Sequence, residues 1–72
     1  MNNNFLTLFI WMHGRLHTWN FCINTVEGRE YFFCRNRNGR IHTFKDAAEQ
    51  TAKIARFIDM GYKPCQYEAL PR

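Results

Sequence analysis

The chain has 72 residues, 46% hydrophobic and 17% aromatic, which is enough apolar side chain for one small domain. That composition excludes a disordered tail, and the length excludes enzyme folds that enclose a deep catalytic cleft. The formal net charge of +4 favours an anionic partner.

The first predicted element is an apolar strand at residues 5–12, which form an uncharged run, FLTLFIWM. This run is shorter than the roughly 20 residues that span a bilayer. Three asparagine residues precede it, whereas a signal peptide would begin with basic residues, so we predict no membrane contact. We expect His13-Gly14 to turn the chain into residues 15–18. Because both faces of this strand are apolar, a homodimer through it is an open alternative.

Alternation with period two follows and predicts an antiparallel sheet. Residues 19–24 alternate apolar and polar side chains, and Glu27-Gly28 is typical of a two-residue hairpin loop. A second strand is expected at residues 31–34. Asn38-Gly39 is the strongest hairpin signal in the chain, and residues 41–43 form a short strand after it.

A single amphipathic helix is predicted at residues 44–60, with Thr43 as its N-cap and Gly61 beyond its end. Its stripe of small and apolar residues comprises Ala47, Ala48, Thr51, Ile54, Ala55 and Ile58. The expected fold is one α+β domain: a sheet of three to four strands within residues 5–43, packed on the helix, and an irregular tail at 61–72. Tyr67 and Leu70 of this tail are expected to pack back.

The two hairpin loops fix which side chains share a face of the sheet. A loop at Glu27-Gly28 pairs Cys22 with Phe33, and a loop at Asn38-Gly39 pairs Arg35 with His42. The face predicted to meet the helix carries Trp19, Phe21, Ile23, Phe32, Cys34 and Ile41. The other face carries Arg29, Tyr31, Phe33, Arg35, Arg37, Arg40 and His42.

This second set is the candidate binding site. A guanidinium group binds phosphate in a planar fork, and aromatic rings such as Tyr31 and Phe33 can stack on bases. The pattern favours a nucleic-acid partner, with DNA preferred over RNA. Two alternatives stay open: the face binds an acidic protein surface, or it is an ordinary solvated sheet face.

Residues 19–57 combine Trp-x-Phe, Gly-Arg, Asn-Gly-Arg and Thr-Phe-Lys-Asp-Ala-Ala-Glu before a helix. This pattern resembles the three-stranded-sheet-plus-helix DNA-binding domains of phage and transposon tyrosine recombinases, and it is similar to the plant ethylene-response domain. The resemblance implies that the sheet enters the DNA major groove and that Arg29, Arg35, Arg37 and Arg40 contact DNA. In style the chain is also similar to small phage and plasmid accessory proteins such as anti-CRISPR inhibitors, which implies occlusion of a host nucleoprotein complex.

No catalytic triad, carboxylate pair or complete set of metal ligands is legible in the sequence. His13, His17 and Cys22 have no second ligand pair to complete a tetrahedral site. Three cysteines at uneven spacing predict free thiols in a cytoplasmic protein rather than a disulfide framework. We therefore predict a non-catalytic binding module without a cofactor or a metal.

Overall fold

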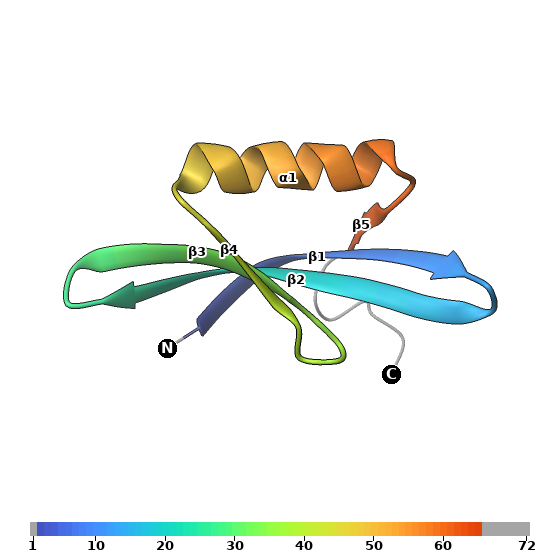
Figure 1. The fold of residues 1–72 in the computed structure, drawn as a ribbon, viewed down its shortest axis with the longest axis horizontal. Helices are drawn as coiled ribbons and strands as arrows, with labels where there is room; N and C mark the ends of the chain where they lie inside the picture. The colour runs from blue at the N-terminus through green and yellow to red at the C-terminus, as the bar shows by residue number, and fades with distance from the viewer. Residues whose placement is uncertain (1, 66–72) are drawn as a thin grey trace.

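Residues 2–65 fold as one antiparallel sheet covered on one face by a single helix (Figure 1). The computed structural model describes residues 2–65 of the chain. Its elements are β1 (Asn2–Met12), β2 (Arg15–Val26), β3 (Arg29–Asn36), β4 (Ile41–Phe44), α1 (Ala47–Asp59) and β5 (Lys63–Cys65), and the five strands lie in the order β4-β3-β2-β1-β5. The predicted α+β class is confirmed, with a sheet of five strands in place of three or four.

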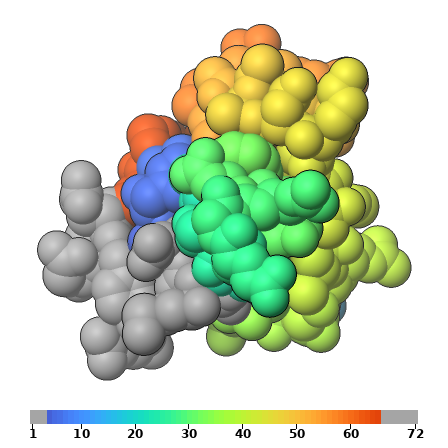
Figure 2. All heavy atoms as spheres, turned by 90° about the vertical axis from the view of Figure 1, so that its left-hand side faces the viewer, coloured from blue at the N-terminus to red at the C-terminus, as the bar shows by residue number. Residues whose placement is uncertain are grey.

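The core lies between α1 and the sheet, and Figure 2 shows the helix above the β2–β3 hairpin. Leu8, Phe21 and Cys34, from three neighbouring strands, are fully buried there. Phe57 of α1 packs on Phe21 with its ring centroid 5.8 Å away. Aromatic rings supply much of this core because a small domain must bury a large area with few residues.

Two hairpins turn as the sequence predicts. His13-Gly14 and Glu27-Gly28 both have positive φ at their two central positions, the conformation of type I′ turns. The second turn pairs Val26 with Arg29 and Phe21 with Cys34, which confirms the predicted register of β2 and β3. The first turn joins β1 to β2, and residues 15–18 belong to the same long strand as residues 19–26.

The predicted register of β4 is wrong by one residue. The structure pairs Arg35 with Ile41 and Cys34 with His42. The reason is a three-residue loop, in which Gly39 takes a φ of +89° and the Asn36 N–H donates to the Arg40 carbonyl at 3.0 Å. Ile41 therefore points away from α1, and His42 points toward it.

The helix begins three residues later than predicted, and its N-cap is Asp46 rather than Thr43. The Asp46 carboxylate accepts from the Glu49 N–H at 2.9 Å, while Glu49 accepts from the Lys45 N–H at 3.3 Å. Thr43 lies in β4 because that strand continues through Phe44, which pairs with Phe32. Pairing in the sheet thus takes precedence over the cap signal at Thr43.

The predicted helix stripe is also wrong in part. Ile54 packs on the core as expected, but its neighbours there are Phe57 and the buried amide of Gln50. Gln50 Nε2 donates to the backbone carbonyls of Cys22 and Phe33 at 3.0 and 3.2 Å. The remaining members of the predicted stripe are exposed: Ala47, Ala48, Thr51, Ala55 and Ile58.

The predicted irregular tail contains a short strand. β5 pairs with residues 7–9 of β1, and the Tyr62 ring stacks on Phe57 with centroids 5.0 Å apart. The expected packing of Tyr67 and Leu70 lies outside the described residues. Among residues 2–65, no helix has both the length and the hydropathy needed to cross a membrane.

Candidate nucleic-acid interface

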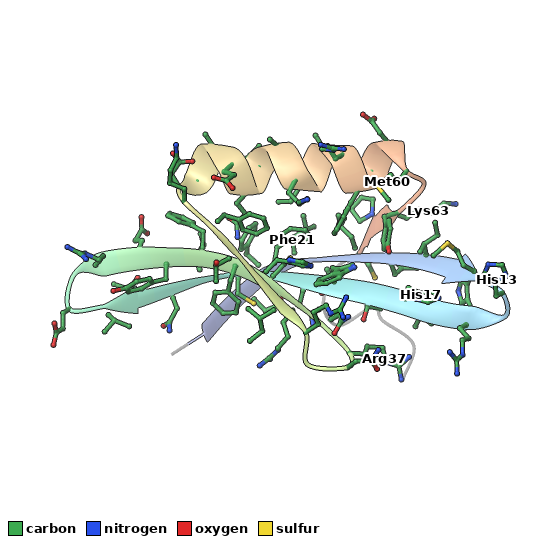
Figure 3. All side chains as sticks on the ribbon, viewed as in Figure 1. His13, His17, Phe21, Arg37, Met60 and Lys63 are labelled. Carbon is green, nitrogen blue, oxygen red and sulfur yellow. The ribbon has the colours of Figure 1, made fainter. Side chains whose placement is uncertain are left out.

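The face of the sheet opposite α1, here called the open face, carries alternate side chains of β3. Because Cys34 and Phe21 point into the core, the alternation places Arg29, Tyr31, Phe33 and Arg35 on the other side. In Figure 3, Phe21 lies between the helix and the sheet, and Arg37 lies beyond the sheet on the side away from the helix. The structure thus brings together the four candidate residues of β3.

The two arginines of β3 have no partner within the described part of the chain. Arg29 and Arg35 are exposed, and neither guanidinium group forms an ion pair or a hydrogen bond with residues 2–65. Within residues 2–65, no acidic side chain of a strand points to the open face. Glu30 lies in β3, but the alternation places its side chain on the α1 side. The positive charge is therefore uncompensated within the described fold, and an anionic partner would compensate it.

The two aromatic rings differ in exposure. The side chain of Tyr31 is 47% exposed, while Phe33 is half-buried. Across β2, they pair with Asn24 and Cys22. Tyr31 therefore offers an accessible ring surface for stacking, and Phe33 contributes a smaller apolar surface between Tyr31 and Arg35.

The β3–β4 loop adds Arg37 and Arg40 at the end of β3. Both are exposed, and neither side chain is used to hold the loop. The loop is held by Asn36 instead, whose side-chain oxygen accepts from the N–H groups of Asn38 and Arg40 at 3.0 and 2.8 Å. The two guanidinium groups therefore extend from an ordered turn.

His42 does not belong to the open face, which corrects the prediction. Its ring packs against Trp19 with centroids 5.1 Å apart, on the side covered by α1. Two further cations, Lys53 and Arg56, belong to α1, and Lys53 Nζ lies 5.9 Å from the Phe57 ring centroid. None of the three can contact a ligand that lies flat on the open face.

Sequence reasoning missed polar and apolar residues contributed by β1, β2 and β4. Asn20 pairs with Arg35 on one side and with Thr7 on the other, and the Thr7 hydroxyl donates to its side-chain oxygen at 2.8 Å. Trp11, 61% exposed, and Ile41, 53% exposed, extend the open face at its two sides. The alternation of polar and apolar residues in β2 indicates that Asn20 lies on the open face. Placing Ile41 on that face requires the correct length of the β3–β4 loop.

The two buried thiols lie on opposite sides of the sheet, Cys22 on the open face and Cys34 in the core, as the β2–β3 register predicts. Burial raises the pKa of the Cys22 thiol, although the positive charge of Arg35 partly offsets this. Burial raises the pKa of Cys34 to about 11. Both sulfurs therefore carry their protons at neutral pH and are poor nucleophiles.

Comparison with family models, curated proteins and solved structures finds no match to this chain. The geometry and charge of the open face are therefore the basis for inferring a function.

Proposed function

We propose that the protein is a non-catalytic module that binds nucleic acid, DNA in the first instance, along β3 on the open face. The observation that carries the proposal is a row of side chains on one face of β3 in which Arg29 and Arg35 flank the rings of Tyr31 and Phe33. Neither arginine is paired within residues 2–65, and no acidic residue lies between them on that face. Phosphates would meet Arg29 and Arg35, and a base would stack on Tyr31.

The dimensions of the sheet favour a single strand over a duplex groove. At about 3.3 Å per residue, Arg29 and Arg35 are separated by about 20 Å along β3, which suits an extended strand of several nucleotides. Five strands about 4.8 Å apart span about 19 Å, which exceeds the roughly 12 Å width of the major groove. In a duplex, only the sheet edge at β4 and the loop with Arg37 and Arg40 could enter the groove.

Fluorescence anisotropy with labelled single-stranded DNA, duplex DNA and RNA of equal length tests the proposal. With about four phosphate contacts, raising salt from 50 to 200 mM should weaken single-strand binding by about 50-fold. The double variant Arg29→Gln/Arg35→Gln should bind roughly tenfold more weakly at 50 mM salt and show a shallower salt dependence.

A matched control is available on the helix. Arg56→Gln removes the same charge from an exposed position on the opposite layer, and its affinity should stay close to that of the unmodified protein. Equal losses in Arg56→Gln and Arg29→Gln would show attraction by net charge alone. Absence of binding to all three nucleic acids at low salt would overturn the proposal.

A second candidate function is an inhibitor or adaptor that binds an acidic protein surface, as anti-CRISPR proteins do in occluding host complexes. The exposure of Trp11 and Ile41 favours it, because large apolar side chains beside arginine are typical of protein interfaces. A partner protein that is lost with Trp11→Ser and with Arg35→Glu, in the absence of any nucleic-acid binding, would favour this candidate.

A further inference from the structure

A pocket of about 490 Å³ lies beside the sheet, where β3 turns away from β2. β2 pairs with β3 only from Trp19 onward, so its first four residues have a free edge on that side within the described chain. The β3–β4 loop forms the opposite wall with Asn36, Arg37 and Asn38. The volume is within the range of small-ligand pockets, roughly 300–1,000 Å³.

The charged residues that line the pocket are of one sign. Arg15 and the imidazole of His17 line the β2 wall, Arg37 lines the loop wall, and no acidic residue of the described part of the chain contributes to either wall. None of the three side chains is engaged in an ion pair or a hydrogen bond with residues 2–65. Figure 3 shows His17 on β2 and Arg37 at the loop, in the same half of the molecule.

Both walls are held in place before any ligand arrives. On one side, β1 pairs with Arg15 and His17 through Met12 and Ile10, and the adjoining Trp19 ring packs between His42 and Phe57. On the other side, the loop is fixed by hydrogen bonds to the backbone and side chain of Asn36. Because the backbone of both walls is already ordered, a ligand has to order only the side chains that contact it, which favours affinity.

We propose that this pocket binds a phosphate group, which Arg15 and His17 contact from β2 and Arg37 contacts from the loop. A terminal phosphate suits the site best, because three of its oxygens are available to donors on two walls. The volume leaves room for the sugar that carries the phosphate. The source is either a free nucleotide or the phosphorylated end of a nucleic-acid strand. Arg15 and His17 lie outside the open-face site, so the pocket can be tested separately from it.

The experiment is a two-dimensional ¹⁵N–¹H NMR titration of the full chain at constant ionic strength. The probes are inorganic phosphate, adenosine monophosphate, adenosine and sodium chloride. Saturable shifts are expected at the backbone amides of residues 15–19 and 36–38 with the two phosphate compounds and not with adenosine or chloride. Absence of saturable shifts at tens of millimolar phosphate would overturn the proposal.

Variants separate this pocket from the open face. Arg15→Gln and Arg37→Gln should each raise the dissociation constant for adenosine monophosphate at least about tenfold, since each removes a charge-assisted hydrogen bond. Both residues are exposed, so the variants should stay folded. Arg56→Gln, at an exposed position of α1, should leave the dissociation constant unchanged, and an equal effect there would contradict the site. Loss of open-face binding in Arg29→Gln with the pocket intact would separate the two proposals.

The remaining probes identify the source of the ligand and test its chemistry. If the source is a strand end, a 5′-phosphorylated oligonucleotide should shift the same amides at lower concentration than its 5′-hydroxyl counterpart and than adenosine monophosphate. If the source is a free nucleotide, adenosine monophosphate should match or exceed the oligonucleotide. A short acidic peptide that saturates these amides at lower concentration than adenosine monophosphate would overturn the phosphate assignment.

Discussion

The two faces of the sheet are built from the same strands and yet bury very different fractions of their aromatic side chains. Under α1, Phe21 is fully buried and contacts Phe44 and Phe57. On the open face, Trp11 is 61% and Tyr31 is 47% exposed. Full burial of a large apolar side chain stabilises a fold by roughly 1.5–3 kcal/mol, so the helix-covered face should supply most of the stability.

Because of this difference, the residues that determine stability are not the residues that can bind a ligand. The residues that hold the fold together cannot touch a partner, whereas the exposed residues of β3 can change with little cost to folding. Substitutions that respect this separation should change either the free energy of unfolding or the affinity for a ligand, and not both.

The largest expected effect is at the centre of the core. Phe21→Ala should lower the free energy of unfolding by about 3–5 kcal/mol, because it removes buried ring area and leaves a cavity. Tyr31→Ala, the matched substitution on the open face, should lower it by less than about 1 kcal/mol. Urea unfolding followed by circular dichroism measures both. Equal losses would mean that the open face is as tightly packed as the core.

The next effect concerns the polar contact between α1 and the sheet. Gln50→Met keeps the length of the side chain but removes both hydrogen bonds to the Cys22 and Phe33 carbonyls. We expect a loss of about 1–3 kcal/mol in the same unfolding measurement, because the buried carbonyls lose a donor. Thr51→Ala, one position further on the exposed side, should change stability by less than about 0.5 kcal/mol. A neutral Gln50→Met would contradict this account.

Much of the sheet could be predicted because its signals are local. Alternation along β2 and the two-residue turn at Glu27-Gly28 determine the β2–β3 register, and that register placed Tyr31, Phe33 and the β3 arginines correctly. β4 was misplaced because Asn38-Gly39 allows either a two-residue or a three-residue loop. In the longer loop the Asn36 side-chain oxygen accepts hydrogen bonds from the Asn38 and Arg40 N–H groups, and a hairpin signal alone does not contain that information.

The side of α1 that faces the sheet could not be predicted from hydrophobicity alone. Gln50 counts as polar on a helical wheel, yet it faces inward because two strand carbonyls accept its hydrogen bonds. The pocket beside β2 was equally hidden, since Arg15 and Arg37 are distant in sequence and meet only where β3 leaves β2. Features of this kind depend on contacts between elements rather than on local pattern.

A smaller effect depends on pH and on the buried thiol of the helix-covered face. The pKa of Cys34 is about 11 in the folded protein, against an ordinary value of 9.0, because burial disfavours the thiolate. Between these values the unfolded thiol loses its proton while the folded one keeps it. Stability should therefore fall as pH rises from about 9 to about 11, by roughly 1–2 kcal/mol from this group.

The comparison with Cys34→Ala isolates that contribution. Urea unfolding of both proteins at pH 8 and pH 10.5 cancels the titration of tyrosines and lysines that they share. The variant should lose less stability than the unmodified protein over this interval. An identical loss in both would show that Cys34 does not keep its proton through folding.

The smallest expected effect tests where the boundary between the two faces runs through β4. Ile41 pairs with Arg35 and is 53% exposed, whereas Phe44, three residues on, stacks on Phe21 with ring centroids 6.3 Å apart. Ile41→Thr keeps the β-branched shape and should lower the free energy of unfolding by less than about 0.5 kcal/mol. Phe44→Thr should cost more than about 2 kcal/mol, because it removes a ring from the core. A two-residue loop at Asn38-Gly39 would place Ile41 under α1, and Ile41→Thr would then cost at least about 1 kcal/mol. The ratio of the two losses in urea unfolding therefore reports the register of β4 directly. That register determines whether a ligand on the open face contacts Ile41 or His42.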